Sequence, residues 1–370
     1  MIFINAQVLD GDFRLRKADV EINGEKIVRL ADKLSYTEQD LVVDCAGYTI
    51  VPGFVDIHVH GGAGADTCDA DAEGLRAMAK FLLTKGVTSF CPTTMTVSDA
   101  EIEKSLAVVK ACMADTEGAR IVGVNMEGPF ISHAKKGAQG DEFIQPPDFD
   151  VFKAFYDGCG GIIKLVDIAP ECDEKGGFIE QASKLCTVSV AHTATDYDGA
   201  KAAFAKGATH ATHLFNAMSG MTHRAPGVVG AVFDSDTVCG ELICDGIHIH
   251  PAVVRTVFKL MPGRVCVISD AMRLSGMEDG QGMLGVNLVT VKNGRATLPD
   301  GTIAGSVTNL HDELKNLVSW GIPFEEAVRA MTLTPARQIG MAHEIGSLAV
   351  GKRADMVVLD DKLEIVAVYH

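Results

Sequence analysis

Apolar and polar residues alternate over the first 50 positions, which is the period of short β-strands with one buried face. The segment 18–30 (ADVEINGEKIVRL) places Asn23-Gly24 between two such runs, and this dipeptide is a strong hairpin signal. The C-terminal segment GSLAVGKRADMVVLDDKLEIVAVYH has the same character. We therefore predict a small β-sandwich domain built from both chain termini, residues 1–50 and 345–370.

The pattern changes over residues 51–344, where short apolar runs alternate with segments of helical period. This alternation predicts an α/β fold in which helices connect parallel strands. Eight strands in this order favour a (β/α)8 TIM barrel. We expect the strands to end near His60, Thr93, Glu127, Ala169, His192, His213, His248 and Asp270.

Four segments have a clear helical pattern: 71–86, 99–118, 197–207 and 251–263. The first two begin with an Asp at the expected N-cap and finish with a Gly. A second Asn-Gly pair lies within 287–298 (NLVTVKNGRATL) and predicts a ribbon inserted into the barrel.

Composition restricts the functional classes. The chain has 370 residues, of which 47% are hydrophobic and 22% charged, so it can build a large core. The net charge of −16 argues against nucleic acid and anionic membranes as partners. No signal peptide or run of roughly 20 apolar residues is seen, so we expect a cytoplasmic protein. The ten cysteines form no C-x-x-C pair and are expected to be reduced thiols.

The expected strand ends carry imidazoles and carboxylates, and active sites of barrels lie at these ends. In DIHVHGG both histidines lie on one face of a strand and can chelate one ion. Each residue taken alone has an ordinary structural explanation, such as a packed histidine or a loop-anchoring carboxylate. Together they favour a site for a divalent metal such as Zn, Fe or Mn, held by His58, His60, Glu127, His192, His213 and Asp270.

Longer motifs make the resemblance specific. The segments PGFVDIHVHGG and GKRADMVVLD are typical of the opening and closing parts of the amidohydrolase superfamily. Between them the chain resembles the N-acetylglucosamine-6-phosphate deacetylase family through the ordered motifs NMEGPFIS, KKGAQ, AHT, THLFNAMS, HRAPG, CDGIH, SDAM and TIAGS. The resemblance extends over essentially the whole chain.

The resemblance implies roles for the strand-end residues. Glu127, His192 and His213 match the family's core metal ligands. His58 and His60 match a pair that holds a second metal in some members, so one or two ions are implied. Asp270 matches the catalytic acid/base and also contacts the metal site.

The resemblance also implies a set of substrate-contacting positions. At one of them some members carry a His where this chain has Gln139. A basic loop at His133, Lys135 and Lys136 is either a solvated patch or approaches the sugar phosphate, and the role of His223 is open. The matching positions are Ala138, Gln139, Asn216, Ala217, Arg224, His248, Ile303, Ala304 and Gly305.

The implied activity is deacetylation of N-acetyl-D-glucosamine 6-phosphate to D-glucosamine 6-phosphate and acetate. A bound metal would polarise the amide and lower the pKa of water to about 7, with Asp270 as general acid/base. The guanidinium of Arg224 suits a phosphate. Three alternatives are weighed against it: the galactosamine epimer as substrate, another cyclic-amide hydrolase or deaminase of the superfamily, and a non-catalytic binding or scaffold protein on the same barrel. The resemblance further implies a homodimer.

Overall fold

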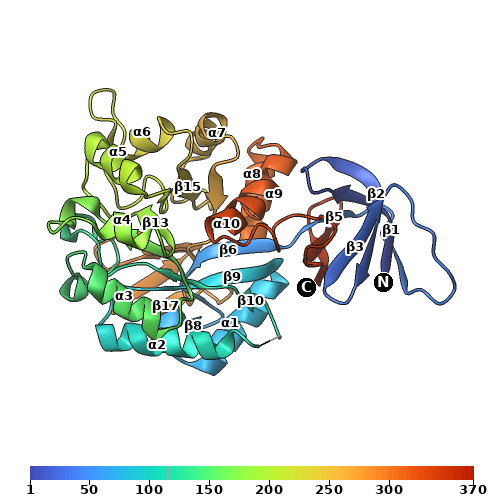
Figure 1. Ribbon diagram of the computed structural model, residues 1–370, viewed down its shortest axis with the longest axis horizontal. Coiled ribbons are helices and arrows are strands. Elements are labelled where there is room, and N and C mark those ends of the chain that lie inside the picture. Colours follow the sequence, from blue (N-terminus) through green and yellow to red (C-terminus); the bar gives the residue numbers. More distant parts are fainter. Residues whose placement is uncertain (116) are drawn as a thin grey trace.

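The computed structural model describes residues 1–115 and 117–370. Within these residues, eight parallel strands follow one another in chain order around a barrel (Figure 1). An additional short strand, β10 (Arg120–Ile121), pairs with β9 outside this order. The barrel strands are β6 (Phe54–Val59), β9 (Val87–Thr94), β11 (Val124–Met126), β12 (Ile163–Ile168), β13 (Thr187–Val190), β14 (His210–Ala211), β15 (Cys239–Leu242) and β16 (Val265–Val267).

The first and last strands meet through the segments at their carboxyl ends. The Asp270 amide donates to the His58 carbonyl, and the His60 amide donates to the Ala271 carbonyl, each at 2.9 Å. Below these bonds, Ser269 Oγ donates to Asp56 Oδ2 at 2.6 Å. The predicted α/β barrel is therefore confirmed, and its closure brings the two ends of the barrel sequence to the same place.

Helices surround the barrel (Figure 1). In α1 the buried residues Leu75, Met78, Ala79 and Leu82 recur at the spacing of one helical face, which packs on the strands. The helices are α1 (Ala72–Thr84), α2 (Asp99–Cys112), α3 (Phe149–Gly158), α4 (Phe178–Ala182), α5 (Tyr197–Lys206), α6 (Gly227–Phe233), α7 (Pro251–Leu260), α8 (Leu310–Ser319), α9 (Phe324–Ala330) and α10 (Leu333–Gln338).

Both predicted boundaries of helix α2 were wrong. Helix α2 ends at Cys112 instead of near Gly118, and its N-cap is Ser98 instead of Asp99. The Ser98 amide donates to the Glu101 carboxylate at 3.0 Å, which is half of a capping box. Of the predicted helical span, Thr116 lies outside the described residues.

Strand β15 ends at Leu242, six residues before the expected end at His248. The chain turns because Asp245 Oδ1 accepts hydrogen bonds from the amides of Ile247 (2.8 Å) and His248 (2.9 Å). His248 consequently lies in the loop that leads to α7.

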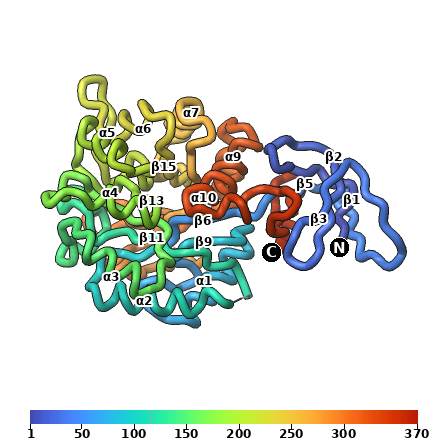
Figure 2. Tube along the Cα trace, viewed as in Figure 1, coloured from blue at the N-terminus to red at the C-terminus, as the bar shows by residue number. Residues whose placement is uncertain are grey.

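Strands from both termini form one sheet beside the barrel, and both chain ends lie at this sheet (Figures 1 and 2). The sheet has its own core, which includes Phe3, Val20, Ile50 and Met356. The predicted domain boundaries, 1–50 with 345–370 and 51–344, stay a prediction. In the described chain the order is β21 (Ile365–Tyr369), β20 (Met356–Leu359), β5 (Thr49–Pro52), β1 (Ile2–Leu9), β2 (Leu15–Asn23) and β3 (Lys26–Ala31), with β4 (Val42–Asp44) beside β1.

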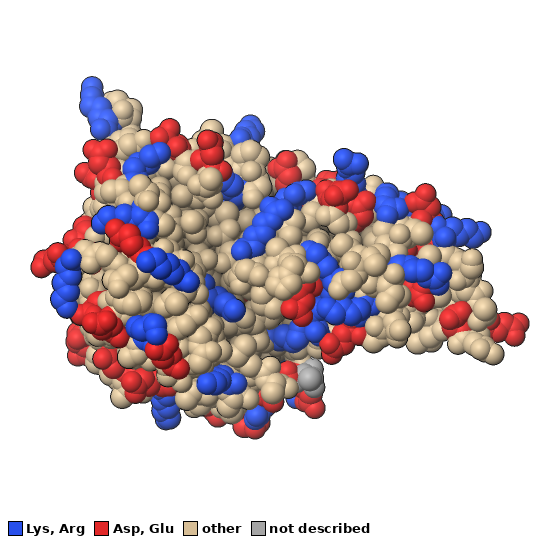
Figure 3. Space-filling view, viewed as in Figure 1, with Lys and Arg blue, Asp and Glu red and all other residues tan. Residues whose placement is uncertain are grey.

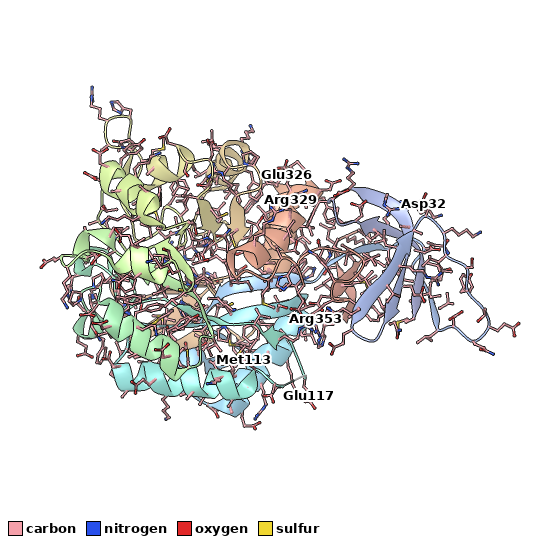
Figure 4. All side chains as sticks on the ribbon, in the orientation of Figure 1. Asp32, Met113, Glu117, Glu326, Arg329 and Arg353 are labelled. Carbon is pink, nitrogen blue, oxygen red and sulfur yellow. The ribbon has the colours of Figure 1, made fainter. Side chains whose placement is uncertain are left out.

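Arginines line the junction between the barrel and this sheet, where Figure 4 labels Arg329 and Arg353. The Arg329 guanidinium lies 4.4 Å from the centre of the Phe13 ring. Arg353 Nη1 lies 2.9 Å from Glu25 Oε2 on the turn between β2 and β3. These contacts tie helix α9 and the segment before β20 to the turns of the N-terminal strands.

The second Asn-Gly pair forms the predicted ribbon. Strands β17 (Gly280–Leu284), β18 (Asn287–Lys292) and β19 (Arg295–Thr297) pair antiparallel, and Asn293 and Gly294 turn with positive φ. Two short strands, β7 (Gly61–Gly62) and β8 (Ala65–Asp66), pair directly after β6.

The surface carries charges of both signs (Figure 3), and the cysteines are unpaired. Acidic and basic side chains are interspersed on the face that Figure 3 shows. Each of the ten cysteines, all of which the structure describes, is a free thiol. Among the described residues we find no helix with the length and apolar character needed to span a membrane.

Candidate metal centre

The structure brings the six predicted strand-end residues together at the carboxyl end of the barrel. Each lies within three residues of the end of its strand, and all six are buried. They come from five of the barrel strands: His58 and His60 from β6, Glu127 from β11, His192 from β13, His213 from β14 and Asp270 from β16.

One group consists of Glu127, His192 and His213. Glu127 Oε1 lies 3.1 Å from Nε2 of each histidine. The two Nε2 atoms are 3.0 Å apart. His192 is oriented from its other side, because its Nδ1 lies 2.9 Å from the Lys135 carbonyl.

The second group consists of His58, His60 and the same Glu127. His60 Nε2 lies 3.2 Å from Glu127 Oε2 and 3.3 Å from Asp270 Oδ1. His58 Nε2 lies 3.5 Å from Glu127 Oε1 and 3.6 Å from Asp270 Oδ1. One carboxylate, Glu127, therefore stands between the two groups, with Oε1 near His192, His213 and His58 and Oε2 near His60.

Both groups fit a divalent metal ion. In each group the ligand atoms lie within 4.8 Å of one another. His58 is fully buried, yet its Nε2 has no hydrogen-bond partner among the described residues. A buried polar atom without a partner is costly, and coordination to an ion would satisfy it. Imidazole and carboxylate are ligands that Zn, Fe and Mn accept.

Backbone strain marks the same positions. His192, His213 and Asp270 have φ values of 42°, 28° and 46°, a region that non-glycine residues rarely adopt. Such conformations persist where the surrounding structure enforces them, and they are common at functional sites. Here they turn the chain out of the strand and direct the side chain towards the group.

The charges of the cluster reinforce one another. Burial disfavours the charged form of His60, but Asp270 and Glu127 outweigh burial and raise its pKa to about 10. Burial disfavours the carboxylate of Glu127, but the surrounding histidines outweigh it and hold its pKa well below the usual range. Burial likewise opposes ionisation of Asp270, whose pKa is nevertheless lowered by His60 and His58. Both acids are thus kept ionised.

A cavity of about 580 Å³ opens above the cluster. Most of the predicted substrate positions line it, together with the basic loop at His133, Lys135 and Lys136. Arg224 is exposed, and neither it nor Ala304 is among the described residues that line this cavity. The predicted positions that do line it are Ala138, Gln139, Asn216, Ala217, His248, Ile303 and Gly305.

Gln139 contacts the cluster directly. Its Oε1 accepts the Thr96 amide at 2.7 Å, which fixes the orientation of the side chain, and its Nε2 donates to Glu127 Oε2. The side-chain amide of Gln139 therefore positions the Glu127 carboxylate, a role that the sequence did not indicate. His248 is held in a similar way, with its Nδ1 2.7 Å from Asp245 Oδ2.

Glu241, which lies in β15 and is fully buried, was not among the predicted site residues. Its carboxylate contacts His58 Nδ1 and His210 Nε2, each at 3.0 Å. The only signal in the sequence is a lone charge within the apolar run VCGELIC.

Comparisons with known proteins agree on one family. Residues 49–369 match the amidohydrolase family. N-acetylglucosamine-6-phosphate deacetylase of Bacillus subtilis (strain 168) is 37% identical over 332 residues, which cover 87% of this chain and 83% of that protein. The enzyme of the same name from Danio rerio is 34% identical over 384 residues, covering 99% of this chain and 94% of its own.

Solved structures give the same result. The crystal structure of N-acetylglucosamine-6-phosphate deacetylase from Pasteurella multocida has a TM-score of 0.93 and 28% identity, covering 100% of this chain and 97% of that one. A mutant of the Mycobacterium smegmatis enzyme in complex with N-acetyl-D-glucosamine-6-phosphate has a TM-score of 0.93 and 31% identity, with the same coverage.

Proposed function

The chain belongs to the amidohydrolase family, and we propose that it hydrolyses N-acetyl-D-glucosamine 6-phosphate to D-glucosamine 6-phosphate and acetate. The observation that carries this proposal is the pair of ligand groups that share Glu127 on the floor of a cavity of about 580 Å³. The relatives named as deacetylases of this sugar phosphate support the choice of substrate.

The amidohydrolase family is metal-dependent, and the residues that would hold ions are the two groups around Glu127. A bound divalent metal supplies Lewis-acid polarisation of the amide carbonyl and lowers the pKa of a water nucleophile to about 7. We propose two ions per subunit, because each group offers three buried ligands. Zn, Fe and Mn are the candidates that suit these ligand types.

Asp270 is the proposed acid/base. It is ionised, lies beside His60 and lines the cavity, so it can accept a proton from the attacking water. The same carboxyl group then gives the proton to the amine nitrogen as the bond to the acetyl carbon breaks. Water thereby supplies one hydrogen to the amine, and its oxygen remains in acetate.

Residues at the cavity wall are proposed to bind the sugar. The contact with Asp245 fixes the His248 ring at the wall, where it can donate a hydrogen bond to the substrate or to the oxygen that develops negative charge. Lys135 and Lys136 line the rim and offer positive charge to the phosphate. Arg224 keeps its proposed role in phosphate binding from an exposed position outside the described cavity lining.

Two further expectations stay predictions. A homodimer is implied by the family resemblance. A cytoplasmic location is expected from the composition of the chain. Size-exclusion chromatography with light scattering gives the mass of the assembly directly.

Acetate release tests the proposed function. The purified protein, supplied with Zn²⁺ or Mn²⁺, is incubated with the N-acetylated glucosamine and galactosamine 6-phosphates and with both unphosphorylated sugars. We expect fastest release from the glucosamine phosphate. Faster release from the galactosamine phosphate would favour the epimer, equal rates on the unphosphorylated sugars would refute the phosphate contacts, and release from none of them would leave a non-catalytic barrel.

A further inference from the structure

A single buried carboxylate lies beneath both ligand groups. Glu241 Oε2 is 3.0 Å from His58 Nδ1 and accepts the backbone amide of His213 at 3.1 Å. Its other oxygen, Oε1, is 3.0 Å from His210 Nε2. Glu241, His58 and His210 are each fully buried. One side chain therefore contacts a ligand from each group, on the side away from the cavity.

This contact determines which nitrogen of His58 can bind a metal. An ionised carboxylate can only accept hydrogen bonds, so a neutral His58 ring carries its proton on Nδ1, facing Glu241. The lone pair is then on Nε2, which faces Glu127 and Asp270 and has no hydrogen-bond partner among the described residues. Without Glu241 the proton could reside on either nitrogen, and one of the two forms cannot coordinate an ion through Nε2.

We propose that Glu241 is a positioning residue that sets the affinity of the ion held by His58, His60 and Glu127. It fixes the tautomer and the ring orientation of His58, as outer carboxylates do for other metal-binding histidines. The same oxygen also holds the His213 amide at the strained turn after β14, so it links the two ligand groups. The inference rests on the proposed metal-dependent function.

A purely structural role for Glu241 makes a different prediction. In that case the carboxylate matters because it satisfies a buried network, and any variant that breaks the network would act alike. His210 provides the matched comparison because it contacts the opposite oxygen of Glu241 and is not one of the six ligands. Glu241→Gln and His210→Gln both replace one buried polar side chain of this network with an amide.

The test is a titration of metal-free protein with Co²⁺, followed by calorimetry and by the visible absorption of the bound ion. We expect the wild-type protein and His210→Gln each to bind two equivalents of Co²⁺. The affinity at each site should be similar in the two proteins. We expect Glu241→Gln to bind one equivalent as wild type does and the second about 10–100-fold more weakly. The melting temperature of each metal-free variant shows whether it is folded.

Three results would overturn the inference. They are wild-type binding of both ions by Glu241→Gln, an equal loss in His210→Gln, and a wild-type protein that binds a single ion. A wild-type protein that binds no ion would instead refute the metal-dependent function itself, so the two failures are distinguishable.

A second measurement needs no variant and covers the case in which Glu241→Gln does not fold. In the Zn²⁺-loaded wild-type protein, ¹⁵N NMR of labelled histidines reports which ring nitrogen carries the proton. We expect His58 to carry it on Nδ1 and to coordinate through Nε2. A His58 that carries its proton on Nε2 would contradict the inference.

Discussion

At the scale of single residues, the candidate centre is arranged so that most of its side chains are held from two directions. His192 contacts Glu127 with one nitrogen and the Lys135 carbonyl with the other. Glu127 in turn accepts a hydrogen bond from Gln139. Groups that are fixed before the substrate binds need not reorganise during the reaction, and such preorganisation is a large part of catalysis.

Asp270→Asn tests the proposed acid/base. The amide keeps the size of the side chain but cannot take a proton from water, so we expect kcat to fall about 10²–10⁴-fold while metal remains bound. Acetate release and metal analysis on the same sample measure both effects. Asp236→Asn, an exposed position outside the cavity lining, is the matched control and should keep wild-type activity. Near-normal turnover in Asp270→Asn would remove this residue from the mechanism.

Lys136→Gln tests the binding of the phosphate. The side chain lines the cavity, and losing one charge-assisted hydrogen bond should lower kcat/KM for the phosphorylated sugar about tenfold. The slow reaction of the unphosphorylated sugar should not change. Lys259→Gln, an exposed position on α7, controls for the loss of surface charge. Equal effects on the two sugars would show that Lys136 does not contact the phosphate.

At the scale of secondary-structure elements, five barrel strands end at the candidate ligands, and several helices begin at side-chain caps. In α1, Asp71 accepts the amides of Glu73 and Gly74, which would otherwise be unpaired at the helix start. Helix α8 carries a different kind of residue, because its Glu313 is fully buried and contacts the Cys244 amide, just after β15. These two elements make separate predictions about stability.

Asp71→Ala should destabilise the protein through loss of the cap. The expected cost is about 1 kcal/mol of unfolding free energy, which corresponds to a decrease in Tm of about 2 °C in a chain of this size. Asp361→Ala, an exposed turn residue, is the control. If the two variants melt at the same temperature, the Asp71 bonds contribute nothing measurable to stability.

Glu313→Gln should change the pH dependence of stability. Burial, together with the charges of Asp245 and Asp56, raises the pKa of Glu313 well above its ordinary value of 4.5. The folded protein therefore holds this proton more tightly than the unfolded chain, so Glu313 lowers stability increasingly as pH rises above that ordinary value. Gln keeps the bond that Oε1 accepts from the Cys244 amide and carries no charge.

The Tm difference between Glu313→Gln and wild type should accordingly increase in favour of the variant between about pH 5 and about pH 8. A difference that is constant over this range would show that Glu313 does not titrate differently in the folded protein.

At the scale of the whole molecule, the barrel and the His and Glu residues at its strand ends were predictable because both follow from local periodicity. An apolar run that ends in His or Glu identifies a strand and its functional end together, as it does for Glu127 and His192. Contacts between strands have no such signal. The position of Glu241 beneath His58 depends on barrel closure, since 183 residues separate the two.

The errors have a common physical origin. The end of β15 was misplaced because the side chain of Asp245 turns the backbone, which apolar periodicity does not report. The amide orientation of Gln139 was not predictable either, because it is fixed by the Thr96 backbone, which is distant in sequence, and its contact with substrate stays a prediction. The family motifs predicted the reaction, whereas the hydrogen bonds that orient the site residues could be found only in the structure.

The most direct test of the account is acetate release from N-acetyl-D-glucosamine 6-phosphate by protein stripped of metal with a chelator and then titrated with Zn²⁺ or Mn²⁺. We predict no release by the stripped protein and recovery of activity as the ions bind. His192→Asn should not recover activity, because the group formed by Glu127, His192 and His213 then lacks one ligand. Release that persists without metal, or that is absent with metal bound, would contradict the assignment of a metal-dependent deacetylase.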